Sequence, residues 1–342
     1  VDDGGATVVA VPPPSPAEVA VNGFFHNLTE EQNTCLAGNR TLRDAATAYI
    51  AANIVRSMGE VTMEWNVGMN AATFATAAIE AVCNGGEVDF EESRINGIKL
   101  GSNLPNCASS MVLNFMLKNP ENSTSTLLID KVFSALGNGM PINDRDFITT
   151  FRVGNISGNG ATTVVYNPTT QKYEATVTLS QNLINNGTKL AVAKTILHES
   201  IHAFLKYTAK QFPLLFTNPD GDFSTLVAAW QVHNDENYAQ HVYMANLIED
   251  MATDLGLFTS EQYFYPDPFI SSVSIAYYEA VAWSGVALIS DPTGAAPYIE
   301  NPVFVQIYPS ANDRDNIIKI FNTENGTATY SGYSPLINNN CN

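Results

Sequence analysis

The sequence contains no basic cluster, no long apolar run and no CxxC pair. Acidic residues outnumber basic ones 34 to 16, which gives a formal net charge of -18. Because neutralising phosphates needs a basic surface, this composition argues against nucleic acid as a partner. A membrane-spanning helix needs a run of about 18 apolar residues. The most apolar window, 274–290, is interrupted by Glu279, so we expect no membrane span.

The four cysteines, Cys35, Cys83, Cys107 and Cys341, lack the close spacing of a zinc or redox pair. Their even number predicts two disulfides, in any of three connectivities. Six N-x-S/T sequons and a low lysine content accompany them. The chain starts at Val1 without a leader-like segment, as expected for a trimmed start. Together these features predict an exported protein, either secreted or held at the cell surface.

Hydrophobic periodicity divides the chain into regions. Residues 1–20 are rich in proline and predict an extended linker or tail, suited to tethering the chain to a larger assembly. Residues 21–140 have helical periodicity, and 147–180 alternate with a period of two. Helical patterns resume after residue 188. We therefore expect an α+β fold, mainly helical, with a small antiparallel sheet preceding the helix that carries the motif below. Residues 141–342 contain this sheet and the motif helix, and they form either a domain of their own or one domain with residues 21–140.

Residues 194–207 read KTILHESIHAFLKY and contain His198, Glu199 and His202 in an H-E-x-x-H pattern. On a helix, the two histidines project from the same face one turn apart, so both imidazoles can reach one metal ion. Glu199 is rotated by about 100 degrees from His198. It is better placed to take a proton from a water on that ion than to bind the ion. The pattern therefore predicts a Zn2+ site with Glu199 as general base.

The alternative is that both histidines are ordinary core residues. By chance, this pattern arises on the order of once in a few hundred proteins of such composition. Apolar residues surround the motif at helical spacing, so two imidazoles and a carboxylate would be buried there and would need partners. Four of the five histidines lie within 198–241, and a catalytic zinc needs a third protein ligand. These observations favour the metal site.

Three segments resemble the zincin metallopeptidases, and among them the SprT-like domains and related exported bacterial proteins. They are HESIHAFLKY at 198–207, HVYMAN at 241–246 and YYEAVAWSG at 277–285. The resemblance covers about residues 25–290 and implies a zincin active-site helix with a third histidine on a later helix. The chain lacks the HG that usually introduces that histidine. It also lacks the extended metzincin and gluzincin motifs, so the clan and the substrate stay open.

Four residues compete to be the third ligand: His241, His233, Glu236 and Glu249. His233 lies beside polar residues at the end of its helical pattern, whereas an apolar helical pattern surrounds His241 and would hold its ring in place. Glu249 follows His241 by eight residues, about 12 Å along a helix, so only one of the two can reach the ion. This placement, the scarcity of histidine and the resemblance favour His241.

Further residues have candidate roles near the metal. Tyr278, beside Tyr277, could donate to the oxyanion of a tetrahedral intermediate, although a packed core aromatic is the commoner role. Glu279 and Asp235 could orient a ligand histidine through its second nitrogen. Residues 218–223 lack the twelve-residue loop and closing glutamate of a calcium site, so we predict none there.

The sequence therefore predicts a zinc-dependent metallopeptidase that hydrolyses peptide bonds of a peptide or protein substrate through a zinc-bound water. Residues 173–180, just ahead of the motif helix, would hold an extended substrate by β-pairing. The alternative is a secreted, surface or toxin-associated binding module that keeps a zincin fold and its metal without turnover. The proline-rich leader is the feature that favours this alternative.

Overall fold

The fold is described from a computed structural model, which covers residues 15–58, 63–67, 69–86, 88–90, 94–95, 98–117, 147–211, 235–260, 273–336 and 341. The chain divides into two compact units, Val1–Glu91 and Glu92–Asn342. Residues 94–117, which lie within the region 21–140 expected from the sequence, belong to the second unit. Each unit is described by itself.

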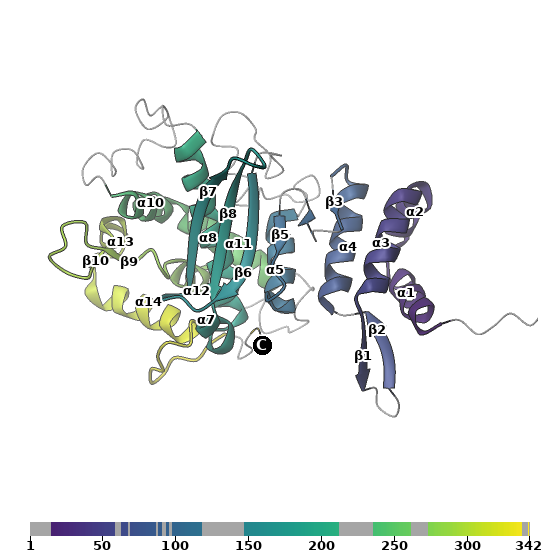
Figure 1. Ribbon diagram of the computed structural model, residues 1–342. Helices are drawn as coiled ribbons and strands as arrows, with labels where there is room; N and C mark the ends of the chain where they lie inside the picture. The colour runs from purple at the N-terminus through teal and green to yellow at the C-terminus, as the bar shows by residue number, and fades with distance from the viewer. Residues whose placement is uncertain are drawn as a thin grey trace, which may run out of the picture. The chain divides into compact units, whose positions relative to one another are not determined.

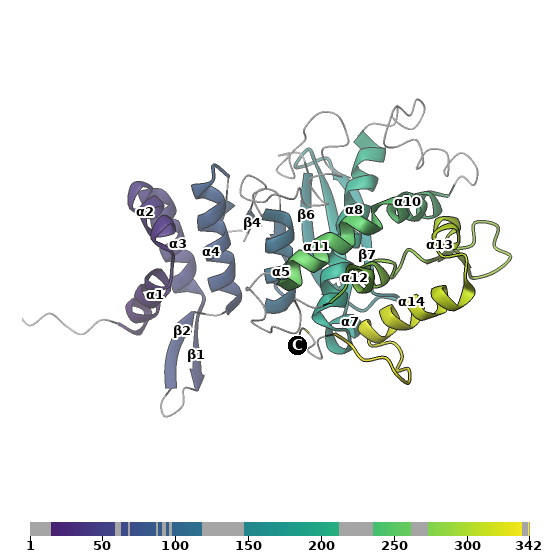
Figure 2. The same ribbon diagram turned by 180° about the vertical axis from the view of Figure 1, so that it is seen from behind.

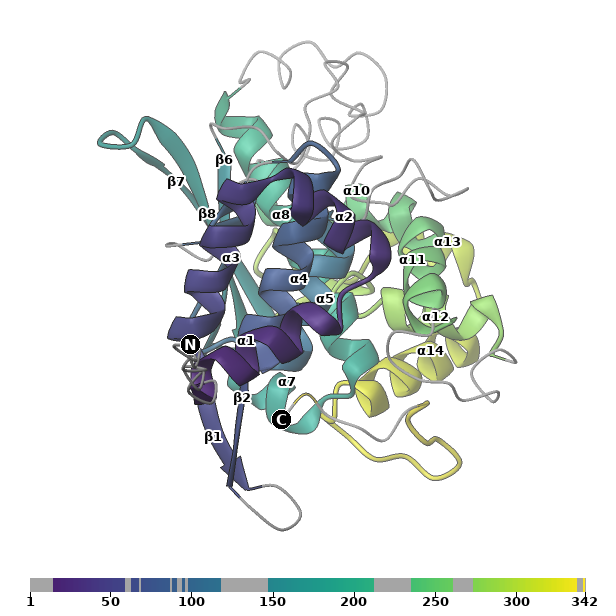
Figure 3. The same cartoon turned by 90° about the vertical axis from the view of Figure 1, so that its right-hand side faces the viewer.

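The first unit is mainly helical and has its own small core. Its elements are α1 (Pro16–His26), α2 (Glu30–Gly38), α3 (Arg40–Ala52), β1 (Ile54–Met58), β2 (Met63–Val67), α4 (Met69–Cys83) and β3 (Val88–Asp89). Figure 3 shows α3 beside α4, with β1 and β2 running from one end of the helices. Leu36, Ile50 and Ile79 are among the residues of the core, and the Cys35–Cys83 disulfide joins α2 to α4.

Two features of this unit differ from the sequence-based expectation. Helix α1 starts inside the segment 1–20 that we expected to be a linker. Ser15 and Glu18 form a capping box, and proline suits the first helical position. Residues 1–14 lie outside the described residues. Strands β1 and β2 pair antiparallel within a region expected to be helical, because the strong helical patterns on either side masked a short hairpin.

The second unit contains a mixed sheet. Its strands are β4 (Arg94–Ile95), β5 (Ile98–Leu100), β6 (Phe147–Gly154), β7 (Gly160–Asn167) and β8 (Lys172–Ser180), paired in the order β4-β5-β6-β8-β7. Strand β8 is antiparallel to β7 but parallel to β6, and β6 is parallel to β5. The α+β, mainly helical class is confirmed. The sheet is not purely antiparallel as expected, because β8 inserts between β6 and β7 instead of continuing a meander.

The helices of this unit include α8 (Lys189–Gln211), which lies against β7 and β8. They are α5 (Asn106–Leu117), α7 (Gln181–Asn186), α8 (Lys189–Gln211), α10 (Glu236–Met244), the short 3-10 helix η4 (Ala245–Leu247), α11 (Ile248–Ser260), α12 (Ile275–Ala282), α13 (Pro302–Ile307) and α14 (Ala311–Glu324), with a further strand pair β9 (Leu288–Ser290) and β10 (Tyr298–Glu300). Figures 1 and 2 show α8 against the sheet, with α11 and α12 on the far side of α8. The Cys107–Cys341 disulfide ties the C-terminal end to α5.

The start of α8 is fixed by a buried carboxylate. Thr188 accepts the Ala191 backbone N–H at 3.2 Å and donates its hydroxyl to Glu324 Oε2. Its own backbone N–H donates to the Glu324 carbonyl at 2.8 Å. Glu324, fully buried at the end of α14, also accepts from the Tyr277 hydroxyl and the Leu336 N–H. These bonds satisfy donors at the first turn of the helix and set where α8 begins.

None of the described helices is both long enough and apolar enough to cross a bilayer.

Candidate metal centre

Helix α8 carries the H-E-x-x-H motif on a buried face. Three of its apolar side chains, those of Ile196, Leu197 and Ile201, are at most 1% exposed. This packing holds the helix against β7 and β8. His198 and His202 are each 5% exposed, and their ring centroids lie 4.8 Å apart. Both imidazoles are thus held one helical turn apart, as the spacing predicts.

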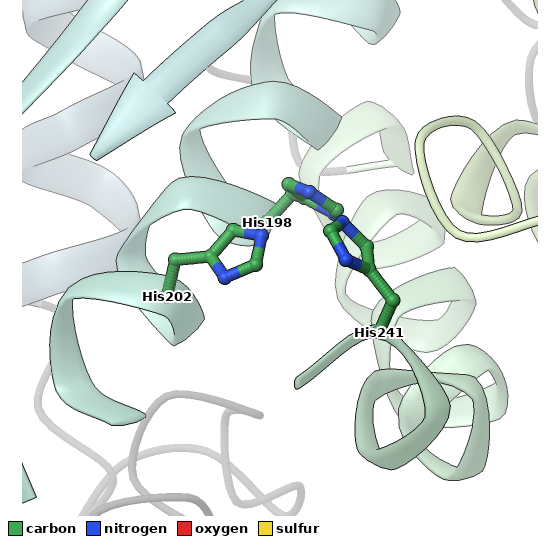
Figure 4. Close-up of side chains that lie close together, drawn as sticks. All are labelled: His198, His202 and His241. Carbon is green, nitrogen blue, oxygen red and sulfur yellow. The ribbon is translucent and has the colours of Figure 1, made fainter. Parts of the chain in front are cut away.

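The third imidazole comes from His241 on α10. Its ring centroid lies 5.4 Å from that of His198 and 4.8 Å from that of His202. One nitrogen from each ring lies within 4.8 Å of the others, and Figure 4 shows the rings turned toward one another. The three buried histidines could therefore hold a metal ion.

The competing ligands lie elsewhere. Glu236 is exposed at the start of α10, and Glu249 is exposed on α11. Glu236 accepts a hydrogen bond from Gln240 Nε2 at 2.8 Å. His233 lies outside the described residues.

Two of the rings have their second nitrogen held by a hydrogen bond. His241 Nδ1 donates to the Asn237 carbonyl at 2.7 Å, and since a carbonyl only accepts, the proton lies on Nδ1. His202 Nδ1 lies 2.6 Å from Gln240 Oε1. Gln240 donates its amide to Glu236, so its oxygen faces the ring and accepts from Nδ1. Both rings therefore keep Nε2 unprotonated, the form that binds a metal.

These orienting groups are not the ones that the sequence suggested. Asp235 caps α10, accepting the Tyr238 N–H at 2.9 Å, and Glu279 interacts with Tyr308. The orienting role of Gln240 was not predicted from the sequence, although Gln240 lies next to His241 and one helical turn after Glu236. The Asn237 carbonyl is a backbone group and has no sequence signal.

Burial disfavours the charged form of all three imidazoles. Desolvation holds the pKa of His198 well below its usual range, and the charge of Lys194 lowers it further. Desolvation, followed by the neighbouring His241, likewise holds the pKa of His202 well below its usual range. The pKa of His241 is lowered by burial as well. Neutral imidazoles are what a metal requires of histidine, and His198 Nδ1 is buried with no hydrogen-bond partner among the described residues. The cluster thus fits a cation.

Glu199 lies beside the cluster without belonging to it. It is 5% exposed and lines the same pocket as the three histidines. The Thr162 hydroxyl lies 2.6 Å from its Oε2, and a Cβ added to Gly160 would lie 2.6 Å from its Oε1. Burial raises the pKa of Glu199, partly opposed by the bond from Thr162. Because residue 160 is glycine, no side chain at this position crowds Oε1 of Glu199.

The pocket has a volume of about 560 Å³ and opens between β7, α8, α10 and the segments around β9 and α14. Besides the histidines and Glu199, its lining includes two lysines of α8, Lys194 and Lys206. Burial lowers the pKa of Lys194 to about 8, opposed by the charge of Glu199.

Tyr278 does not reach this pocket. Its side chain is 4% exposed, and its hydroxyl lies 2.6 Å from Thr259 Oγ1. The neighbouring Tyr277 donates to Glu324. The oxyanion role predicted for Tyr278 is therefore not supported by its position, since core packing of α12 turns the phenol away from the histidines.

Comparisons of the chain with protein-family models, with curated proteins and with solved structures find no match. The fold and the site together define a mainly helical α+β protein with two disulfides and a buried three-histidine cluster able to hold a metal ion.

Proposed function

We propose that the protein is a zinc-dependent metallopeptidase of the zincin type, similar to SprT-like domains, with Glu199 as its general base. One observation carries the proposal: three buried imidazoles converge next to a carboxylate that lines the same pocket. A structural cluster of histidines would need no such carboxylate, nor an open pocket beside it.

The donor set supports zinc as the metal. Three imidazole nitrogens with a fourth position left open are typical of catalytic zinc. Zinc in such a site polarises a peptide carbonyl and lowers the pKa of a coordinated water, which is the chemistry that hydrolysis requires.

Glu199 supplies the proton transfer. Its carboxylate accepts a proton from water through Oε1 and then donates that proton to the leaving amine. Thr162 holds Oε2, so the carboxylate keeps one orientation through both transfers. The raised pKa of Glu199 brings it closer to neutral pH, where a group that both accepts and donates a proton works best.

Strand β7 is better placed than residues 173–180 to hold the substrate. Those residues lie in β8, whose two edges are already paired with β6 and β7. Strand β7 pairs only with β8 among the described strands, and an edge strand offers free backbone groups to an extended peptide. Lys206 occupies the Thr162 carbonyl, so an extended peptide would pair with other backbone groups of β7 that face away from β8.

The two disulfides support export, so we propose that the enzyme acts outside the cytosol on peptides or proteins. Tethering through the proline-rich N-terminal segment stays a prediction, because residues 1–14 lie outside the described residues.

The test is hydrolysis of casein and of a peptide library by the zinc-loaded chain and by Glu199→Gln. The amide keeps the size of the side chain but cannot take a proton, so we expect zinc binding to persist and turnover to fall by several orders of magnitude.

Glu249→Gln is the matched control, since it makes the same change at an exposed position on α11 and should leave turnover as it is. Equal turnover in Glu199→Gln and the wild type would refute the general-base assignment. Zinc binding without any turnover in the wild type would leave the binding-module alternative standing in its place.

A further inference from the structure

Helix α8 carries a stripe of four pocket-lining residues at four-residue intervals: Lys194, His198, His202 and Lys206. Two of the three charged side chains that line this pocket, among the described residues, are therefore lysines; the third is Glu199. In a chain with a net charge of -18, a pocket with more basic than acidic side chains needs an explanation.

The two lysines differ in what they contact. Lys206 Nζ donates to the Thr162 carbonyl at 2.8 Å and so ties α8 to β7. Lys194 is 2% exposed, yet no described residue forms a hydrogen bond or an ion pair with its Nζ. Glu199 acts on it electrostatically but lies beyond ion-pair distance. A buried cation without a bonded counterion is costly, which points to a partner that the chain itself does not supply.

The space beside Lys194 is open because residue 285 is glycine. Gly285 has a φ of +77°, and a Cβ added there would lie 3.5 Å from Lys194 Nζ and 3.5 Å from His198 Nε2. The ammonium and the imidazole thus lie at most twice that distance apart, which is the span of about two residues of extended chain. Uncharged polar side chains line the same pocket, among them Ser284, Asn322 and Thr327.

We propose that Lys194 forms an anion subsite that takes a carboxylate group of the substrate, one or two residues from the bond that is cut. The inference rests on the proposed peptidase function for its substrate class. One ammonium among uncharged polar side chains matches the single charge of a carboxylate. That carboxylate belongs either to the C-terminus of a peptide or to an Asp or Glu side chain, and both sources are compared below.

The experiment measures binding, so it does not depend on turnover. Calorimetry on zinc-loaded Glu199→Gln at pH 7 compares three forms of one acetylated tetrapeptide: the free acid, its C-terminal amide, and the amide with Glu as last residue. We expect one of the carboxylate forms to bind about 10- to 100-fold more tightly than the plain amide. A tighter free acid identifies the C-terminus, and a tighter Glu amide identifies the side chain.

Adding Lys194→Met should remove this preference, and Lys194→Arg should keep part of it, because arginine retains the charge. Lys206→Met is the matched control, because it removes a lysine from the same stripe. Whatever its effect on overall affinity, it should leave the preference between the peptides intact. Equal binding of all three peptides to zinc-loaded Glu199→Gln, with both lysines in place, overturns the proposal. This comparison does not require that a Lys194 variant folds. A preference lost equally in Lys206→Met overturns it too.

Hydrolysis by the wild-type chain separates the two proposals. Carboxylate preference without hydrolysis of any peptide supports the subsite and contradicts the peptidase function. Hydrolysis without carboxylate preference contradicts the subsite alone. A Lys194→Met variant whose kcat falls equally on acid and amide substrates, with KM unchanged, also contradicts the subsite, because the lysine would then act on the reaction itself.

Discussion

Replacing Gln240 with alanine tests how the site presents its histidines. Gln240 is 2% exposed, and its oxygen lies 2.6 Å from His202 Nδ1. Without it, the ring loses its only described orienting bond and its proton can move to Nε2, the nitrogen that should face the metal. Removing such an outer partner typically lowers metal affinity about 10- to 100-fold, equivalent to roughly 1.4–2.7 kcal/mol. Leaving a buried N–H unpaired costs a similar amount, about 1–3 kcal/mol.

The affinity is measured by competition for zinc with a chromophoric chelator, on Gln240→Ala and on the wild type at equal pH. Gln181→Ala is the control, because Gln181 is an exposed glutamine that bonds only Asn185 among the described residues, and it should bind zinc as the wild type does. Far-ultraviolet circular dichroism confirms that both variants are folded. Zinc affinity within about twofold of the wild type in Gln240→Ala would refute the orienting role and the tautomer that it implies.

Three further predictions follow from the same geometry. Chelation should release about one zinc per chain and lower the melting temperature by several degrees, because zinc at a thousandfold over its Kd stabilises the folded state by about 4 kcal/mol; an unchanged transition would contradict a native metal site. Gly160→Ala should cut hydrolysis at least tenfold with zinc retained, since the new Cβ would lie 2.6 Å from Glu199 Oε1, whereas Gly23→Ala, which meets nothing within 4 Å, should behave as wild type. Cys341→Ser removes a disulfide whose two cysteines are 234 residues apart in the sequence. This change should lower the free energy of unfolding, measured by urea denaturation, by about 2–4 kcal/mol. Thiol titration of the unreduced wild type should find no free cysteine.

Most helices and the strands of 147–180 followed from the sequence, whereas the β1–β2 hairpin, the start of α1 and the pairings between distant segments did not. Alternation with a period of two identified the strands of 147–180, and β6 and β7 bury one face as such a pattern implies. The same alternation carries no information about which strand lies next to which. The parallel pairing of β6 with β8 joins Phe147 to Tyr173 and depends on how the whole unit packs. For the same reason, four cysteines allowed three connectivities, and only the packed chain selects Cys35–Cys83 and Cys107–Cys341.

At the site, the sequence predicts which histidines lie together but does not predict which ring nitrogen His202 and His241 present. That His198 and His202 share a helix face follows from helix geometry, and the apolar pattern around His241, the scarcity of histidine and the resemblance together favoured His241 as the third ligand. Which nitrogen His202 and His241 present is decided by acceptors on α10: an amide oxygen for His202 and a backbone carbonyl for His241. The Asn237 carbonyl reaches His241 within α10 itself, whereas Gln240 reaches His202 only after α8 and α10 have packed, so no residue pattern on α8 specifies either acceptor. A metal centre therefore depends on α10 in two ways. Helix α10 supplies His241 as a ligand, and its Gln240 orients His202, a ligand on α8. Changes in α10 that leave every histidine in place should consequently weaken the site, whereas H-E-x-x-H alone, transplanted onto another buried helix, should bind zinc poorly.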